Sequence, residues 1–480
     1  MKIFHKVASI CDDAIDNFSV FIPTIDMMNA LERRSTFALS SIFALRMLGL
    51  FMIIPVFAVA GQSYQHATPT LIGLAVGVYG LSQALLQIPF SLWADRYHRK
   101  TLIVIGLLLF ALGGAVAAMS ESIYGVIIGR AIAGAGAVSA VVMALLSDVT
   151  REQERSKAMA IMGMSIGLSF VVAFSIGPWL TSLVGISGLF WVTSIMGVLA
   201  IFMLFLVPKT TRHHSSIRQD YRQQLKQVLK MGDLNRLHVS VFALHLLLTA
   251  MFIYLPSQLI AFADIPLSKH GMVYLPLLVI SLFFAFPSII LAEKYRKMRG
   301  IFITAIVSIV AGLVVLSFGD QSKYILITGL ALFFIAFNVM EALLPSWLSK
   351  SAPIQSKATA MGVNASGQFL GAFCGGMLGG QLLMLNNTSI GWSVLAAIAI
   401  IWLLLSLGLT QPRYLSSIVL PLPVDQIADE WASQLLKFRG IEEVVIMSDQ
   451  QVAYVKLDKR QIDDAVRQDL SQLMGKDLAI

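Results

Sequence analysis

The chain has 480 residues, of which 57% are hydrophobic and 13% are charged, with a formal net charge of +8. A soluble globular domain carries about 25% charged residues, so this composition excludes that class and indicates an integral membrane protein. The basic residues lie in loops that flank apolar runs, which favours lipid headgroups over nucleic acid as their partner. Two isolated cysteines, Cys11 and Cys374, predict neither a disulfide framework nor a metal site, and we expect no cofactor.

Twelve apolar runs are long enough to cross a bilayer, which takes about 20 residues each. They lie near residues 36–60, 70–93, 101–119, 121–147, 158–183, 188–207, 238–262, 271–292, 301–318, 323–348, 358–384 and 390–410. The predicted fold is therefore all-α and membrane-spanning, with one six-helix bundle at 35–207 and a second at 238–411. Residues 1–34 form an N-terminal tail, and 208–237 form a linker with an amphipathic helix from Arg218 to Lys230.

Lysine and arginine are distributed unequally between the two sets of loops. One set holds nearly all of them, namely Arg96, Arg99, Lys100, Arg151, Arg155, Lys157, the linker bases, Lys294, Arg296, Lys297, Arg299, Lys350 and Lys357. The opposite set holds Lys269 and Lys323. Basic loops stay in the cytoplasm during insertion, so we expect both termini to be cytoplasmic.

The two predicted bundles repeat each other. Residues 94–97 (Ala-Asp-Arg-Tyr) recur as 292–295 (Ala-Glu-Lys-Tyr), and 156–160 (Ser-Lys-Ala-Met-Ala) recur as 356–360 (Ser-Lys-Ala-Thr-Ala). Both pairs lie about 200 residues apart and in the same order. The repeat predicts a duplicated six-helix unit with a substrate path between the halves.

Residues 412–480 have a soluble composition and alternate strand and helix patterns. The expected elements, in βαββα order, are 414–422, 424–438, 443–447, 452–457 and 462–474. This order predicts a small cytoplasmic ferredoxin-like α+β domain. It lacks a Cys-x-x-Cys pair after the first strand, so we do not expect it to bind a soft metal.

The loop at 91–100 reads Ser-Leu-Trp-Ala-Asp-Arg-Tyr-His-Arg-Lys. It resembles the loop between helices 2 and 3 of the major facilitator superfamily, whose signature is Gly-x-Leu-Ala-Asp-Arg-x-Gly-Arg-Lys. The positions that match are Ala94, Asp95, Arg96, Arg99 and Lys100, and those that depart are Ser91, Trp93 and His98. The resemblance implies the twelve-helix major facilitator fold. In the fifth span, Gly163, Gly167 and Gly177-Pro178 resemble the motif of the drug/proton antiporter branch.

The same resemblance implies a gating latch at this loop. Asp95 would lie at the start of helix 11, and Arg99 would pair with Asp148, so that the three side chains hold the outward-facing state. Arg96 and Lys100 belong to the same loop, where their charges also set orientation. Ser91 replaces a glycine that lies close to helix 11, and we expect its hydroxyl to fit because that helix is rich in glycine.

Ionisable side chains inside the spans are the strongest functional signal in the sequence. A charge at the bilayer centre costs roughly 2.5–3.5 kcal/mol on insertion scales, so such groups are normally paired or line a cavity. Arg46, Arg130, His245 and Glu341, with Asp148 near a span end, come from spans 1, 4, 7 and 10. In the family that the chain resembles, these spans surround the central cavity.

Histidine and a buried glutamate are the side-chain types here that change charge near neutral pH. We therefore expect Glu341, with or without His245, to carry a transported proton, and Arg46 and Arg130 to receive polar or anionic substrate groups. Asn338 lies three residues before Glu341, on the same helix face, and either lines the cavity or has a packing role. The alternatives are a fixed Arg–Glu pair between the halves and a hydrogen-bonded core histidine.

These features predict a monomeric, proton-coupled exporter of small amphipathic or drug-like molecules. Uptake by proton symport is the alternative within transport, and a membrane sensor that signals through residues 412–480 is an alternative of another class. The sequence contains no Walker loop, nucleophile elbow or metal-ligand cluster, so we expect an ion gradient to supply the energy and no enzymatic activity.

Overall fold

A computed structural model describes residues 28–208, 221–318, 322–353, 356–385, 387–412, 414–422, 428–447, 452–458 and 461. The helices of the first half are α2 (Ala30–Ala60), α3 (Pro69–Arg96), α4 (Arg99–Met119), α5 (Ile123–Ala135), α6 (Ser139–Val149) and α7 (Glu152–Met203). Those that follow are α8 (Tyr221–Lys230), α9 (Gly232–Ala263), α10 (His270–Glu293), α11 (Met298–Leu316), α12 (Lys323–Ser351), α13 (Lys357–Leu382) and α14 (Thr388–Ser406). The C-terminal elements are β1 (Ser416–Pro421), α15 (Ala428–Leu435), β2 (Ile441–Met447) and β3 (Val452–Leu457), and short 3-10 turns follow α2 and α7 and precede α10.

Each predicted span has its helix in the structure. Ten helical stretches of the described chain are long and apolar enough to cross a membrane. One of them, Lys157–Leu206, contains two spans because α7 bends at Gly185, whose φ of 69° is accessible to glycine and strained for other residues. Helix α13, which occupies the predicted span 358–384, is rich in glycine and is not among these ten stretches. The chain is therefore a multi-pass membrane protein.

The fourth span differs from the continuous run predicted over 121–147. It is broken into α5 and α6, with Gly136 in a non-helical conformation at the break. A Cβ on Gly136 would lie 2.2 Å from the carbonyl oxygen of Gly106 in α4, so the two backbones touch there. The break coincides with this contact with α4, which the local apolar pattern does not reveal.

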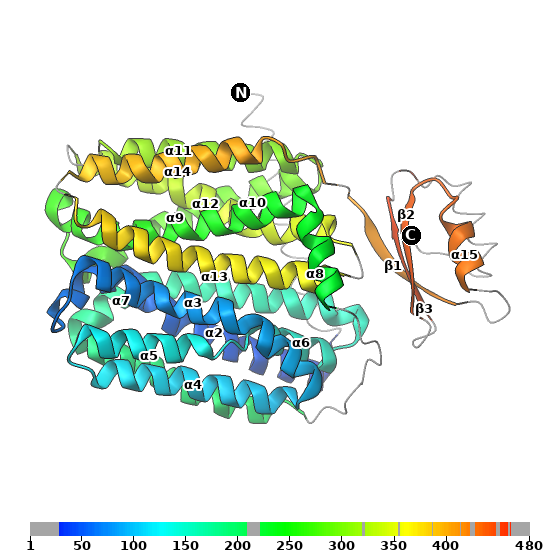
Figure 1. Cartoon of the computed structure of the whole chain (residues 1–480), viewed down its shortest axis with the longest axis horizontal. Coiled ribbons are helices and arrows are strands. Elements are labelled where there is room, and N and C mark those ends of the chain that lie inside the picture. Colours follow the sequence, from blue (N-terminus) through cyan, green and yellow to red (C-terminus); the bar gives the residue numbers. More distant parts are fainter. Residues whose placement is uncertain are drawn as a thin grey trace.

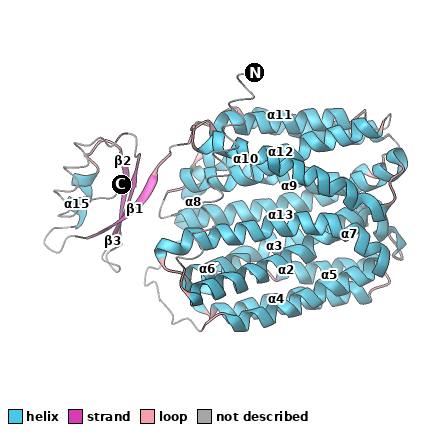
Figure 2. Cartoon of the chain, turned by 180° about the vertical axis from the view of Figure 1, so that it is seen from behind, coloured by secondary structure: helices cyan, strands magenta, loops and turns pink. Residues whose placement is uncertain are grey.

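The helices run side by side along the long axis, with α13 lying next to α3 where the halves meet (Figures 1 and 2). Glycines allow the two backbones to touch near one end. A Cβ on Gly73 would lie 2.3 Å from the carbonyl oxygen of Gly376, and one on Gly380 would lie 2.5 Å from that of Pro69. We call this contact of Gly73 and Gly77 with Gly376 and Gly380 the glycine seam.

Helix α8 lies across the basic end of the bundle, which we define as the end where α3, α6, α10 and α12 finish and the lysine- and arginine-rich loops lie (Figure 1). Its Val228 is fully buried, whereas Leu229 is half exposed. Thr359 at the start of α13 donates a hydrogen bond to Gln224 Oε1 at 2.8 Å. The first residues of the predicted helix, 218–220, lie outside the described chain.

The C-terminal module contains a three-stranded antiparallel sheet in the order β1-β3-β2. Strands β1 and β2 are therefore parallel, separated by β3 and connected through α15, which is a split β-α-β arrangement. Trp431 and Leu435 of α15 pack in one apolar cluster with Leu420 and Val455 of the sheet. A ferredoxin-like fold stays a prediction, because the helix expected at 462–474 lies outside the described residues.

The module contacts the second half of the bundle at the basic end. Asp458 accepts two hydrogen bonds from Arg296, at 2.7 and 3.1 Å, and this carboxylate raises the pKa of Arg296. Lys456, which is buried, donates to the carbonyl oxygen of Ala352 at 2.8 Å. The ring of Tyr414, in the connection to β1, lies 5.2 Å from the guanidinium carbon of Arg296. The module is thus joined both to the loop after α10 and to the end of α12.

Candidate functional site

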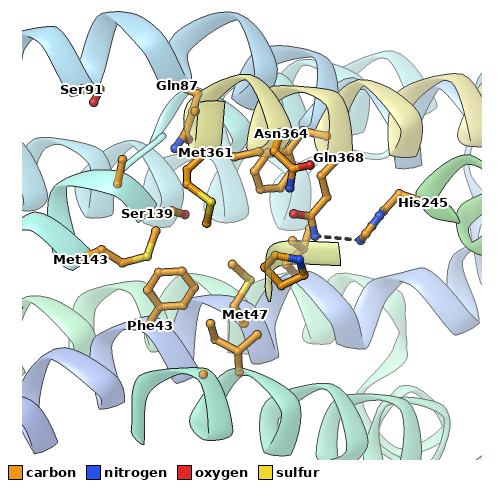
Figure 3. Close-up of a pocket in the computed structure, with 18 of the residues that line it drawn as sticks. Phe43, Met47, Gln87, Ser91, Ser139, Met143, His245, Met361, Asn364 and Gln368 are labelled. Atoms are coloured by element: carbon orange, nitrogen blue, oxygen red, sulfur yellow. Dashed lines mark hydrogen bonds between the residues drawn. The ribbon is translucent and has the colours of Figure 1, made fainter. Parts of the chain in front are cut away.

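One cavity of about 1820 Å³ lies between the two halves, with walls from α2, α3, α5–α7, α9, α12 and α13 (Figure 3). Its surface is mostly apolar and contains many methionine and aromatic side chains, including Phe43, Met47, Trp93, Met143, Met159, Phe170, Phe337 and Met361. Arg99, Asp148 and Gln224 line it at the basic end, so the cavity extends to that end of the molecule.

The opposite end is closed by side-chain packing. The ring of Phe174 lies 4.3 Å from the rings of both Phe170 and Phe252, and Tyr274 lies 5.6 Å from Phe252. These four residues join α7, α9 and α10 across the boundary between the halves. Together with the glycine seam, they make a bundle that is open at the basic end and closed at the other.

His245 and Glu341 lie together on the cavity wall of the second half. His245 Nε2 is 3.6 Å from Glu341 Oε2, and Nδ1 is 3.0 Å from the carbonyl oxygen of Val241. The side chain of Glu341 is 45% exposed to the cavity, whereas that of His245 is 9% exposed. The structure therefore brings together the two titratable side chains that the sequence singled out in this half.

Gln368 is a member of this site that sequence reasoning missed. Its Nε2 lies 2.8 Å from His245 Nε2, and Figure 3 shows the amide of α13 pointing at the imidazole of α9. Asn364 lines the same cavity one turn earlier on α13. Two amide side chains four residues apart in a glycine-rich span were the available signal, because such a pair occupies one helix face.

Arg46 is 2% exposed and makes its hydrogen bonds within the first half. It donates to Ser139 Oγ at 2.7 Å, to Tyr79 Oη at 3.0 Å and to Gln83 Oε1 at 2.5 Å. It is absent from the cavity lining, whereas Tyr79 and Ser139 contribute to it. The structure thus places Arg46 behind the cavity wall, which does not favour the predicted direct contact with substrate.

Arg130 lines the cavity itself, although it is 4% exposed. Its Nε and Nη2 donate to the carbonyl oxygens of Ala75 and Val76 at 3.1 and 3.2 Å, and its guanidinium carbon lies 5.1 Å from the ring centre of Tyr79. No described carboxylate lies within ion-pair distance of Arg130 or Arg46. The alternative of a fixed Arg–Glu pair between the halves therefore has no support here.

Asn338 has both of the roles that the sequence left open. It lines the cavity, and its Nδ2 donates to Ser281 Oγ of α10 at 2.7 Å and to the carbonyl oxygen of Phe334 at 3.1 Å. Because Ser281 is fully buried, this contact ties α12 to α10 next to the His245–Glu341 site.

The loop at 91–100 lies at the open end of the cavity. Arg99 Nη1 and Asp148 Oδ2 are 2.7 Å apart, with both side chains partly exposed. Lys100 Nζ donates to the carbonyl oxygen of Val207 at the end of the first half. Ser91 is exposed at the cavity surface, so in this conformation its hydroxyl is not packed in a tight helix contact (Figure 3). The side chains of Asp95 and Arg96 lie outside what the structure describes.

Among the described residues, no group of three or more His, Cys, Asp or Glu side chains is placed to hold a metal ion. The site therefore consists of a large apolar cavity with a few polar groups, one of which is a half-exposed carboxylate. Such a cavity suits the binding of small organic molecules.

Comparisons with known proteins agree with this architecture. Residues 39–376 match the family described as the Major Facilitator Superfamily. The chain is 42% identical over 448 residues to the inner membrane transport protein YajR of Escherichia coli (strain K12), covering 91% of this chain and 98% of that protein. It is 26% identical over 364 residues to multidrug resistance protein 2 of Bacillus subtilis (strain 168), covering 72% of this chain and 88% of that one.

The crystal structure of a D-xylose-proton symporter has the same fold, with a TM-score of 0.67 at 14% identity, covering 79% of this chain and 98% of that one. At this identity the likeness shows the fold alone. The family consists of small-molecule transporters rather than enzymes. The chain is therefore a multi-pass inner membrane protein that is similar to YajR and belongs to the major facilitator superfamily of transporters.

Proposed function

We propose that the protein exports small amphipathic molecules in exchange for protons, with Glu341 as the group that binds either a proton or the substrate. The observation that carries this proposal is a carboxylate that is 45% exposed to an otherwise largely apolar cavity and lies 3.6 Å from His245 Nε2. A carboxylate in such surroundings gains by binding a proton or a substrate cation, and the two exclude each other.

The apolar walls define the substrate class. Methionine and phenylalanine side chains offer polarisable surface that adapts to different flat or branched apolar bodies. With Glu341 as the exposed charge of the second half, amphipathic molecules with a cationic group are favoured. Arg130, on the wall of the first half, is the candidate contact for a polar or anionic group of the substrate.

The export direction rests on two supports. The glycine-proline pattern of α7 resembles that of the antiporter branch, and one relative is named a multidrug resistance protein. A proton symporter with the same fold keeps uptake as the alternative, because the fold is common to both directions.

We place the basic end in the cytoplasm, with both termini on that side, because lysine and arginine are retained there. In that orientation the cavity is open to the cytoplasm and closed to the outside. The Arg99–Asp148 pair would then belong to a latch that closes the cytoplasmic end together with Asp95 when the protein faces outward.

Transport in proteoliposomes with an imposed pH gradient tests the proposal, with the amphipathic cation ethidium as probe. We expect gradient-driven ethidium movement in the parent and its loss in Glu341→Gln, which keeps the shape of the side chain and removes its charge. Glu121→Gln, at an exposed bend outside the cavity, is the matched control and should retain transport. Movement that survives collapse of the gradient would exclude proton exchange, and full coupling in Glu341→Gln would remove that residue from the mechanism.

The docked C-terminal module favours a second, regulatory role. Its contacts through Asp458 and Lys456 reach the loop after α10 and the end of α12, and Glu341 lies on α12. A ligand of the module would act on the bundle through these contacts. If the module signals without net transport, the protein is a sensor, and the proteoliposome experiment distinguishes the two.

A further inference from the structure

We propose that Gln368 is the positioning residue of the proton site, and that its side-chain amide turns over when His245 gains or loses a proton. This inference rests on the proposed function for the assignment of a proton to His245 and Glu341. It adds a third residue to the site. It also means that a side chain of α13, one of the two helices of the glycine seam, responds to the charge of His245.

The contacts of His245 determine which of its nitrogens titrates. The carbonyl oxygen of Val241, 3.0 Å from Nδ1, only accepts hydrogen bonds, so Nδ1 carries a hydrogen in both charge states. Neutral His245 therefore has its lone pair on Nε2. The amide nitrogen of Gln368, 2.8 Å from Nε2, is a donor that matches this lone pair.

A proton on Nε2 reverses this match. The imidazolium N–H would then face the amide N–H of Gln368, and two donors cannot hydrogen-bond to each other. A half-turn of the amide presents Oε1 in place of Nε2 and restores the hydrogen bond. Gln368 thus has one orientation for the neutral imidazole and the opposite one for the charged imidazole.

The proton itself comes from Glu341, which is open to the cavity. In the transfer the O–H bond of protonated Glu341 breaks and an N–H bond forms at His245 Nε2, leaving a carboxylate and an imidazolium. No other reactant is needed. The separation of 3.6 Å between Glu341 Oε2 and His245 Nε2 must shorten for this step, and the Gln368 amide, 2.8 Å from Nε2, must release the Nε2 lone pair. After the transfer the turned amide accepts the new N–H through Oε1.

No other described charged group contacts the imidazole from the helices that pack on α9. Glu341 on α12 is the charged side chain that does. The other described ionisable side chains on α9 and on the helices that contact it are Asp233, Arg236, His238 and Tyr254 on α9, Glu32, Arg33, Arg34 and Arg46 on α2, Glu154, Arg155 and Lys157 on α7, Lys226 and Lys230 on α8, His270, Tyr274 and Glu293 on α10, Lys323, Tyr324 and Lys350 on α12, and Lys357 and Cys374 on α13; α14 has none. Among the described side chains, the polar groups that contact the imidazole are therefore the carboxylate of Glu341 and the amide of Gln368.

Close backbone contacts hold α13 against α9 around this site, so the side chain of Gln368 is the part that can move. A Cβ on Gly371 would lie 2.3 Å from the carbonyl oxygen of Phe242, and one on Gly375 would lie 2.2 Å from that of Leu246. These contacts hold α13 against α9 on both sides of His245. Rotation of the Gln368 amide is consequently the response open to α13 without separating the two helices.

The test is ¹⁵N NMR of the purified protein labelled with ¹⁵N-histidine, with the His245 signals assigned by their absence in His245→Ala. Across a pH series we expect Nε2 to be the nitrogen that gains and loses the proton, while Nδ1 keeps its hydrogen. Gln368→Leu removes the hydrogen bond to Nε2 in both charge states, and because the bond made by the imidazolium is the stronger one, the titration midpoint should fall by about half a pH unit to one unit. Gln368→Glu places a carboxylate beside the imidazolium, and the midpoint should rise by about one to three units.

Gln258→Leu is the matched control, because Gln258 is a buried glutamine on α9 outside the cavity lining. Its midpoint should equal that of the parent. The proposal is overturned if both Gln368 variants titrate like the control, if Nδ1 rather than Nε2 loses the proton, or if His245 stays neutral throughout. Because the NMR titration needs no substrate, a failure of ethidium transport would leave this result intact and would count against the proposed function alone.

Discussion

Replacing Gly376 by alanine is predicted to shift the protein away from the conformation open at the basic end. A Cβ at this position would lie 2.7 Å from the carbonyl oxygen of Gly73 and 2.9 Å from the Cα of Gly77. Both are backbone atoms that cannot rotate away, so fitting the added methyl group into the closed seam costs about 1–3 kcal/mol. The gain in helix propensity from alanine applies to both conformations and cancels. The equilibrium should therefore move by about 5- to 150-fold toward the form open at the other end.

The assay is labelling of a single cysteine at Ala342, a partly exposed position on the cavity wall, with a membrane-impermeant maleimide applied to either face of oriented vesicles. Cys11 and Cys374 are first replaced by serine. Gly362→Ala is the matched control, because Gly362 lies on the same helix with nothing within 4 Å of its would-be Cβ. Labelling from the face opposite the basic end should increase in Gly376→Ala and stay at the parent level in Gly362→Ala. Equal labelling in the two variants would refute the reasoning that the seam holds this end closed.

Four further predictions concern charged groups. Arg46→Leu leaves three side-chain acceptors without their donor and should lower the free energy of unfolding by about 1–3 kcal/mol, seen as a lower thermal midpoint in detergent; an unchanged midpoint would contradict this. Asp458→Asn should weaken docking of the C-terminal module by about 1–2 kcal/mol, a range that allows for the 27% exposure of the Arg296 side chain. Fluorescence energy transfer between the module and α8 would measure the docking, with Asp458→Glu as the control. Because the pKa of Arg296 is raised, its charge and this contact should persist across the neutral and alkaline range, and loss of docking there would count against the pair. Asp95→Asn should favour forms open at the basic end by about 2- to 5-fold, if its charge stabilises a helix start by about 0.3–1 kcal/mol, and unchanged labelling on both faces would remove it from the latch.

The spans were predictable because lipid imposes a simple requirement. Without water every backbone group must be satisfied within the helix, so length and apolarity alone locate each segment. The break at Gly136 was not predictable, since it arises where α4 touches the chain. The bend at Gly185 was visible only as the gap between two predicted runs. Strand positions in the C-terminal module followed from alternation, whereas the order β1-β3-β2 required coordinates.

The candidate site was predictable as far as charge in an apolar span identifies it. That rule found Glu341, His245 and Arg130 on the cavity wall, because an ionisable group in lipid needs a polar surrounding. It did not separate Arg130 from Arg46, which lies behind Tyr79 and Ser139, since both are equally unusual in sequence. The rule did not find Gln368, because a neutral amide carries no charge that lipid would penalise. Its role depends on its contact with the imidazole of His245.

The C-terminal module is fastened to one half of a molecule whose two halves are expected to rock against each other. Its bonds run from Asp458 to Arg296 and from Lys456 to Ala352, both in the second half. The module would therefore move with that half, and its distance from the start of α4, in the first half, would change with each transport cycle. The distance between two labels at these positions would report turnover in an intact membrane, even without a known substrate.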